Sequence, residues 1–337
     1  MRGAQTEFWE PIDVDIRPAL EVVGAKLSAD ASALKFQVCD NAPCGEVRAK
    51  ATFGGASLPV SLFPPEIPSE TLSLPLPKAN GLVPGLNPLR LDSANGETVF
   101  ETTVECWDLF SRCPAAKANV HFEPVDISKH FNDNLALVHT HEYLSPRSPY
   151  CSIGPGINLF HQWCDAHDCP CGKLDLGVLA AAAHDGLLQT KPGIPFRAAA
   201  EGKNIIFVSQ WDNFPKEVQI PVGRSARHAY LLMASTTNPM QSGIVNGRVV
   251  FHLSGGKQKT LALINPQNLS WCVDHYPNRC GPLNMIEPSV RLGEHVFATI
   301  YSVPLGEAER LDSVGLEAVS NESVIGLMSL TLVPATP

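Results

Sequence analysis

Short apolar runs that alternate with clusters of turn-forming residues dominate this sequence. Seven such runs occupy residues 16–107, and several place an apolar side chain at every second position, the period of a β-strand with one buried face. They cover residues 19–23, 33–38, 47–53, 57–62, 70–76, 87–91 and 98–104. Because short strands with turns at this spacing are typical of two-sheet sandwiches, we predict an immunoglobulin-like β-sandwich over residues 1–107.

A second series of strand-like runs lies in residues 193–337 and predicts a jelly-roll β-sandwich. The intervening residues 108–192 are rich in cysteine and histidine, and we interpret them as a linker and lead-in to the second domain. One short helix is expected there, over residues 175–189, with Asp175 as its N-cap. The low charged fraction of 18%, together with 29 prolines and 25 glycines, favours an all-β protein over one built from long surface helices.

The charge and the known binding motifs limit the partners. The formal net charge is −9 and no lysine- or arginine-rich run occurs, so the sequence predicts no nucleic-acid partner. No stretch of 18 or more apolar residues is present, which predicts no membrane span. The sequence contains no phosphate-binding loop, dinucleotide-binding fingerprint or nucleophile elbow, and it predicts no cofactor.

Ten cysteines predict a secreted protein with disulfide bonds. Three pairs each enclose a short turn, and we expect a bridge within each: Cys39 with Cys44, Cys106 with Cys113, and Cys272 with Cys280. The other four cysteines, whose connectivity stays open, are Cys151, Cys164, Cys169 and Cys171. Because His161 and His167 lie in the same segment, a metal site is the alternative for that segment. Two glycosylation sequons, at Asn268 and Asn321, fit the secreted interpretation.

A glycan site is one interpretation of the segment around Trp211. An aromatic ring can stack on a sugar ring while neighbouring amides and carboxylates hydrogen-bond its hydroxyl groups. The candidate contacts are Trp163, Trp211, Asp212, Asn213, Asn238 and Gln241. The alternative is that Trp211 belongs to the core and that the polar residues after it only shape a turn.

A metal site is one interpretation of two neighbouring histidines. His139 and His141 have a spacing that places both imidazoles on one face of a strand, as in metal sites of the cupin type. A third ligand would come from His121, His161 or His167. The alternative is a solvated or hydrogen-bonded pair of histidines without a metal.

Five segments carry a resemblance to a known family. They are residues 84–88, 143–150, 202–215, 226–242 and 324–332, and the third of them ends in Val208-Ser-Gln-Trp-Asp-Asn-Phe-Pro215. These segments are similar to the C-terminal β-sandwich region of large secreted bacterial glycoside-hydrolase-like proteins, a domain-of-unknown-function family. The resemblance implies an accessory, galactose-binding-like sandwich preceded by an immunoglobulin-like one. Members of that family also have a helical toroid suspected of catalysis, for which this chain lacks the helical content.

We therefore expect a secreted, non-catalytic, carbohydrate-associated protein with a glycan or polysaccharide as its partner. One alternative is a structural subunit of an extracellular filament or surface layer, in which an exposed edge strand pairs with a neighbouring copy. The candidate edge strands are residues 6–16 and 323–333. A second alternative is a glycoside hydrolase or a metal-dependent hydrolase, for which the sequence identifies no catalytic residue.

Overall fold

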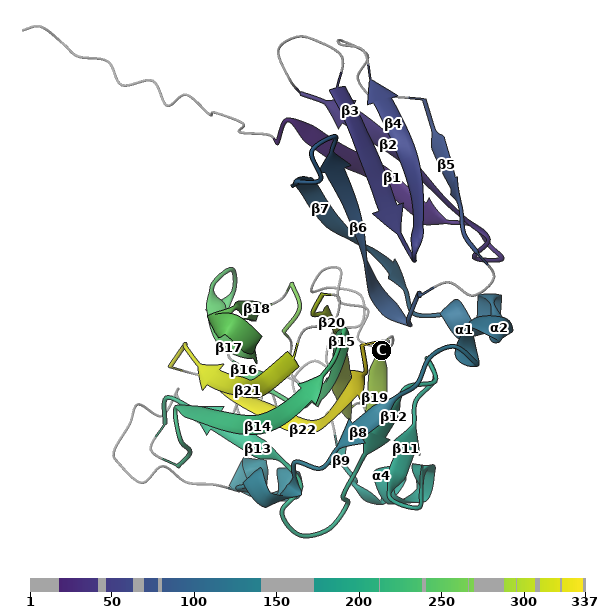
Figure 1. Ribbon diagram of the computed structural model, residues 1–337. Helices are drawn as coiled ribbons and strands as arrows, with labels where there is room; N and C mark the ends of the chain where they lie inside the picture. Colours follow the sequence, from purple (N-terminus) through teal and green to yellow (C-terminus); the bar gives the residue numbers. More distant parts are fainter. Residues whose placement is uncertain are drawn as a thin grey trace, which may run out of the picture. The chain divides into compact units, whose positions relative to one another are not determined.

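The structure, a computed structural model, is almost entirely antiparallel β-structure in the part that it describes (Figure 1). It describes residues 18–41, 47–62, 70–77, 81–140, 173–211, 213–237, 241–265, 267–269, 288–294, 296–306, 310–321 and 323–335. The chain divides into two compact units, the first formed by residues 1–80 and 88–104 and the second by residues 81–87 and 105–337. The predicted all-β sandwich class is confirmed.

The first unit is a sandwich of a three-stranded and a four-stranded sheet. The first sheet has the order β1 (Leu20–Leu27), β2 (Ala33–Asp40) and β5 (Leu72–Pro75), and the second has the order β4 (Ala56–Leu62), β3 (Val47–Phe53), β6 (Gly85–Ser93) and β7 (Thr98–Cys106). Alternate side chains are buried, as the period of two requires; Phe36, Phe53 and Leu91 are at most 1% exposed. All seven strands fall on the seven runs expected from the sequence.

The second unit is built on one large sheet and one smaller sheet. The large sheet has the order β13 (Ile206–Ser209), β22 (Ser323–Val333), β15 (His228–Met233), β20 (Val296–Pro304), β19 (Ser289–Glu294) and β9 (Lys173–Leu174); β8 (Glu123–Val125) and β16 (Thr236–Thr237) also pair with β22. The smaller sheet has the order β14 (Glu217–Ser225), β21 (Arg310–Ala318), β17 (Val245–Leu253) and β18 (Gln258–Ile264).

Two hydrophobic cores cover the two faces of the large sheet. One core joins it to the smaller sheet, with Leu231 and Leu327 on one side and Phe251 and Leu316 on the other. The second core lies on the opposite face and takes in side chains from short helices and loops, including Leu179 of α4 (Gly177–Ala182). Burial on both faces explains why the central strands are continuous apolar runs without alternation.

β22 is a central strand and not an edge strand. It pairs with β13, β15, β16 and β8, and every one of its side chains is buried. The predicted exposed edge over residues 323–333 is therefore wrong, because the uninterrupted apolar run marks a strand that is covered on both faces. The other expected edge, residues 6–16, lies outside the described residues.

The predicted helix over residues 175–189 is too long. The predicted N-cap is also wrong: Asp175 accepts a hydrogen bond from the Gly177 N–H (2.9 Å), but the N-cap of the helix α4 is Leu176, and the helix ends at Ala182. The chain then forms a hairpin of β10 (Ala183–His184) and β11 (Leu187–Gln189), which pairs on with β12 (Pro195–Arg197). Its turn is Asp185-Gly186, with φ of 52° and 73°, and Asp-Gly is a preferred sequence for a two-residue hairpin.

The other helices in the described part of the second unit have only three to six residues each. They are α1 (Leu109–Arg112), α2 (Pro114–Lys117), η1 (Ser128–His130), η2 (Leu135–Thr140) and η4 (Ser254–Gly256). No helix in the described part of the chain has the length and hydropathy needed to cross a membrane.

Candidate functional site

The smaller sheet of the second unit has one buried face and one open face, which we call the outer face. Its strands send alternate side chains into the core between the sheets, and the intervening side chains point away from it. On the outer face these side chains form rows across the four strands. One row is Glu217, Glu317, Arg248 and Ala262, the next is Gln219, Gly315, Val250 and Thr260, and the third is Pro221, Ser313, His252 and Gln258.

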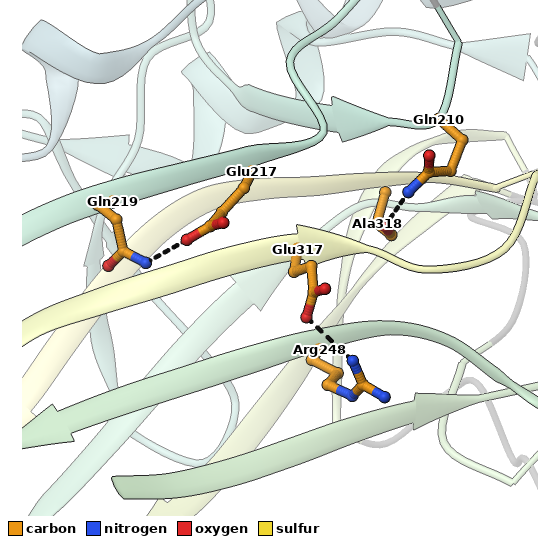
Figure 2. Close-up of polar contacts among 6 residues, drawn as sticks. All are labelled: Gln210, Glu217, Gln219, Arg248, Glu317 and Ala318. Atoms are coloured by element: carbon orange, nitrogen blue, oxygen red, sulfur yellow. Dashed lines mark hydrogen bonds and ion pairs between the residues drawn. The ribbon is translucent and has the colours of Figure 1, made fainter.

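The first row brings two carboxylates and one guanidinium group together. Glu217 and Glu317 face each other on β14 and β21, an arrangement in which like charges repel. Each carboxylate is compensated by a different neighbour: Arg248 Nη1 lies 3.2 Å from Glu317 Oε2, and Gln219 Nε2 donates to Glu217 Oε1 (2.5 Å) (Figure 2). The charges are about 40% exposed in the Arg248–Glu317 pair, so water screens this ion pair and its contribution to stability is small.

Gln219 lies across the centre of the outer face because the facing residue on β21 is Gly315. A Cβ atom at position 315 would lie 2.7 Å from Gln219 Nε2, closer than a real contact. The absence of a side chain at Gly315 therefore makes room for the carboxamide. The outer face combines a planar amide, carboxylates and a guanidinium group, which are the groups that hydrogen-bond to vicinal hydroxyls.

Nearby, Gln210 ties the end of β13 to the end of β21. Its Nε2 donates to the Ala318 carbonyl oxygen (2.6 Å), as Figure 2 shows. The backbone at the end of β21 is thus fixed by a side chain that follows a strand of the large sheet. The sequence signal for the outer face was present in the alternation of Glu217, Gln219 and Pro221 with apolar residues, but it did not show which strands would lie beside them.

The structure describes three of the six predicted glycan contacts, Trp211, Asn213 and Gln241. Trp211 is 2% exposed and packs in the core, which is the alternative that the sequence left open, and in this position its ring cannot stack on a sugar. Asn213 is half-buried, and the backbone carbonyl of Gln241 accepts a hydrogen bond from Asn246 Nδ2 (2.9 Å). Trp163, Asp212 and Asn238 lie outside the described residues.

The first histidine of the predicted pair does not lie on a strand. His139 is in the 3₁₀-helix η2, so the expected two-residue strand spacing is wrong at this position. The apolar residues before it, Leu135 and Val138, are buried in the second unit's core and favour a helical turn here. His141 and His161 lie outside the described residues. Among the residues that the structure describes, no group of three or more histidine, cysteine, aspartate or glutamate side chains could hold a metal ion.

Three of the ten cysteines are described, and all three are free thiols: Cys39, Cys106 and Cys113. The predicted bridge between Cys106 and Cys113 is wrong. Cys106 is buried at the end of β7 with its thiol directed to Asp108 (Sγ to Oδ1 3.7 Å), and the helix α1 separates it from Cys113. Burial, with a smaller contribution from Asp108, raises the pKa of Cys106 to about 11, so the thiol is protonated and unreactive at neutral pH.

Cys39 is a free thiol, so the predicted bridge from Cys39 to Cys44 is not formed. Cys44 itself lies outside the described residues. The other predicted disulfide cysteines lie outside them as well: Cys151, Cys164, Cys169, Cys171, Cys272 and Cys280. The described thiols therefore give no support to the expected disulfide framework.

The two sequon asparagines differ in their surroundings. Asn321 is exposed in the turn between β21 and β22, whereas Asn268 is half-buried. Asn268 Oδ1 accepts a hydrogen bond from the Ile264 N–H and its Nδ2 donates to the Ala262 carbonyl, both at 2.8 Å. The Asn268 carboxamide thereby pairs with strand β18, and a glycan on Nδ2 would have to break this pairing.

Replacing Asn268 is expected to destabilise the protein. Asn268→Ala leaves a backbone N–H and a carbonyl of β18 without their partner, at a cost of about 1–3 kcal/mol in the free energy of unfolding. Urea unfolding followed by circular dichroism measures this. Asn321→Ala is the matched control and should change the free energy by less than about 0.5 kcal/mol; equal effects of the two substitutions would contradict the structural role of Asn268.

Two comparisons with known proteins find no match for this chain. No family model matches it, and the search of curated proteins finds no match. The resemblance to secreted glycoside-hydrolase-like proteins therefore stays a hypothesis from the sequence.

Proposed function

We propose that the protein is an extracellular, non-catalytic carbohydrate-binding protein whose glycan contacts lie on the outer face of the smaller sheet. The single observation that carries the proposal is the set of hydrogen-bonding side chains held on this face. Gln219, Glu317 and Arg248 come from three neighbouring strands of one sheet and project from its open side (Figure 2). A rigid sheet holds such groups at fixed spacings, which lowers the entropy that is lost on binding.

The chemistry of the outer face favours neutral polysaccharides. The two carboxylates accept hydrogen bonds from hydroxyl groups, and the carboxamide both donates and accepts. The two negative charges of Glu217 and Glu317 exceed the single positive charge of Arg248. Uronic acids and sulfated sugars would therefore be repelled. The extracellular setting is supported only by the resemblance and by the exposed sequon at Asn321.

The arrangement of the carboxylates favours binding over hydrolysis. A glycosidase needs an acid and a second carboxylate on opposite sides of the scissile bond. Glu217 and Glu317 instead lie side by side on adjacent strands of the same open face, and Glu317 is held by Arg248. Both carboxylates would contact a ligand from the same side.

Affinity gel electrophoresis with a panel of neutral polysaccharides tests this proposal. We expect retardation of the native protein by at least one polysaccharide, and about tenfold weaker binding for Arg248→Ala, since a charge-assisted hydrogen bond contributes about 1.5 kcal/mol or more. Gln219→Ala removes a neutral hydrogen bond of about 1 kcal/mol and should weaken binding about fivefold. Arg197→Ala and Gln189→Ala are matched controls, because both residues are exposed on the three-stranded sheet of β10, β11 and β12.

Two results would contradict the proposal. The first is a native protein that no polysaccharide in the panel retards. The second is equal retardation of all four variants, which would place the contacts elsewhere. Release of reducing sugar from a retained polysaccharide would overturn the non-catalytic part of the proposal.

A further inference from the structure

Residues 81–87, which we call the strap, belong to the second unit although the residues on both sides of them belong to the first. Leu82 and Val83 are each 1% exposed and Asn87 is 3% exposed. Val83 packs in the same core as Tyr230 and Leu232 of β15. A connecting segment that carries several buried side chains is a structural element of the unit in which it is buried.

Hydrogen bonds from the second unit hold the backbone of the strap at three points. Each bond joins one backbone group of the strap to one side chain of β15, of β20 or of the turn before β15. Arg227 Nη1 donates to the Gly81 carbonyl (2.8 Å), Tyr230 Oη donates to the Pro84 carbonyl (2.6 Å), and the Leu86 N–H donates to Ser302 Oγ (2.9 Å). These partners are far away in the sequence, so the strap is held by tertiary structure and not by its own conformation.

A buried histidine fixes the hydroxyl that binds the strap. His228 Nε2 lies 2.7 Å from Ser302 Oγ, and the two residues are 2% and 5% exposed. Within the strap, Asn87 Oδ1 accepts a hydrogen bond from the Val83 N–H (2.9 Å) and its Nδ2 donates to the Val83 carbonyl (2.8 Å). The buried polar groups of this region therefore hydrogen-bond to one another.

Gly85 allows the strap to approach Ser302 closely. Its φ is +97°, a region that favours glycine, and a Cβ atom there would lie 2.6 Å from Ser302 Cβ and 3.1 Å from Trp107 Cη2. A larger residue could not occupy this position without moving the strap.

The strap continues without a break into the core of the first unit. Strand β6 begins at Gly85 and ends at Ser93. Leu89, two residues after Asn87, is 0% exposed and pairs with Phe53 of β3. One strand is thus fixed at its start by the second unit and along the rest of its length by the first.

We propose that the strap couples the two units so that they unfold in one cooperative transition. If the second unit unfolds, the start of β6 loses its hydrogen bonds and the strand is released next to Leu89. If the first unit unfolds, the strap is joined on both sides to disordered chain, and the conformational entropy of that chain favours release of the strap from the second unit. Independent domains joined by an exposed linker would instead unfold separately.

Differential scanning calorimetry of the full chain tests the coupling with two matched variants. Tyr230→Phe removes the hydrogen bond to the Pro84 carbonyl of the strap. Tyr301→Phe removes a buried hydrogen bond of the same type, to the Asn268 carbonyl (2.5 Å), within the second unit and away from the strap. Both variants keep the aromatic ring, so their cores stay filled.

The expected results differ in kind for the two variants. The native protein should show one transition whose calorimetric and van't Hoff enthalpies agree, and Tyr301→Phe should lower its midpoint and keep it single. Tyr230→Phe should split it into two transitions. Two transitions in the native protein, or a single transition in Tyr230→Phe with the same midpoint shift as Tyr301→Phe, would overturn the proposal.

Discussion

Gly326→Ala is expected to destabilise the second unit by about 3 kcal/mol or more, because the centre of the large sheet has no space for a methyl group. A Cβ atom at this position would lie 2.6 Å from both Ile205 Cδ1 and Phe207 Cε1, and it would overlap the carbonyl oxygen of Ala234. The backbone cannot move away, since the Ala234 N–H donates to the Gly326 carbonyl (3.0 Å) and β22 pairs with strands on both sides.

Thermal and urea unfolding of Gly326→Ala measure this effect. Gly81→Ala is the control, because a Cβ atom there meets no atom within 4 Å, and its free energy of unfolding should change by less than about 0.5 kcal/mol. A Gly326→Ala protein as stable as the native one would mean that the packing around β22 is looser than the structure describes.

Acid is expected to destabilise the protein through His228. Burial lowers the pKa of His228 from 6.5 to about 3, with further lowering from the positive charges of Arg227 and Lys259. Between these two values the unfolded chain binds a proton that the folded chain does not, so stability falls as the pH falls below 6.5. The loss is about 1.4 kcal/mol per pH unit and approaches about 5 kcal/mol near pH 3.

His228→Gln isolates this contribution from those of the other titrating groups. The glutamine does not titrate, and its carboxamide can still hydrogen-bond to Ser302. At pH 7 the native protein should be the more stable of the two, because its imidazole fits the site. The difference between their free energies of unfolding should narrow as the pH is lowered from 6.5 to 4.5. A difference that is constant over this range would show that His228 is accessible to protons in the folded state.

The sequence predicts the strands well because their signal is local. In the first unit, alternation of apolar and polar residues marks several of the strands, such as β6, because they have one buried and one exposed face. In the second unit the continuous apolar run at Ser323–Val333 also marks a strand, but its position in the sheet depends on pairings with residues more than 80 positions away. The run alone could not distinguish an edge strand from a central one.

The candidate site could be predicted only in part, because it depends on register. Glu217, Glu317 and Arg248 are far apart in the sequence and come together through the pairing of three strands. Trp211 is a residue type that often contacts sugars, yet its ring is buried. The residues next to a single aromatic side chain in the sequence do not show whether that side chain is buried. The strap lies within residues 1–107, the range predicted for the first domain, but its bonds to Tyr230 and Ser302 of the second unit span 146 and 216 positions.

The most direct test of the proposed function is nuclear magnetic resonance of the labelled full chain titrated with oligosaccharides of a polysaccharide that retards it. The proposal predicts shifts of the side-chain N–H signals of Gln219 and Arg248, with the signals of Gln189 and Arg197 unchanged. Shifts confined to Gln189, Arg197 or other residues away from the outer face would contradict the proposed site, and a titration without any shift would contradict glycan binding.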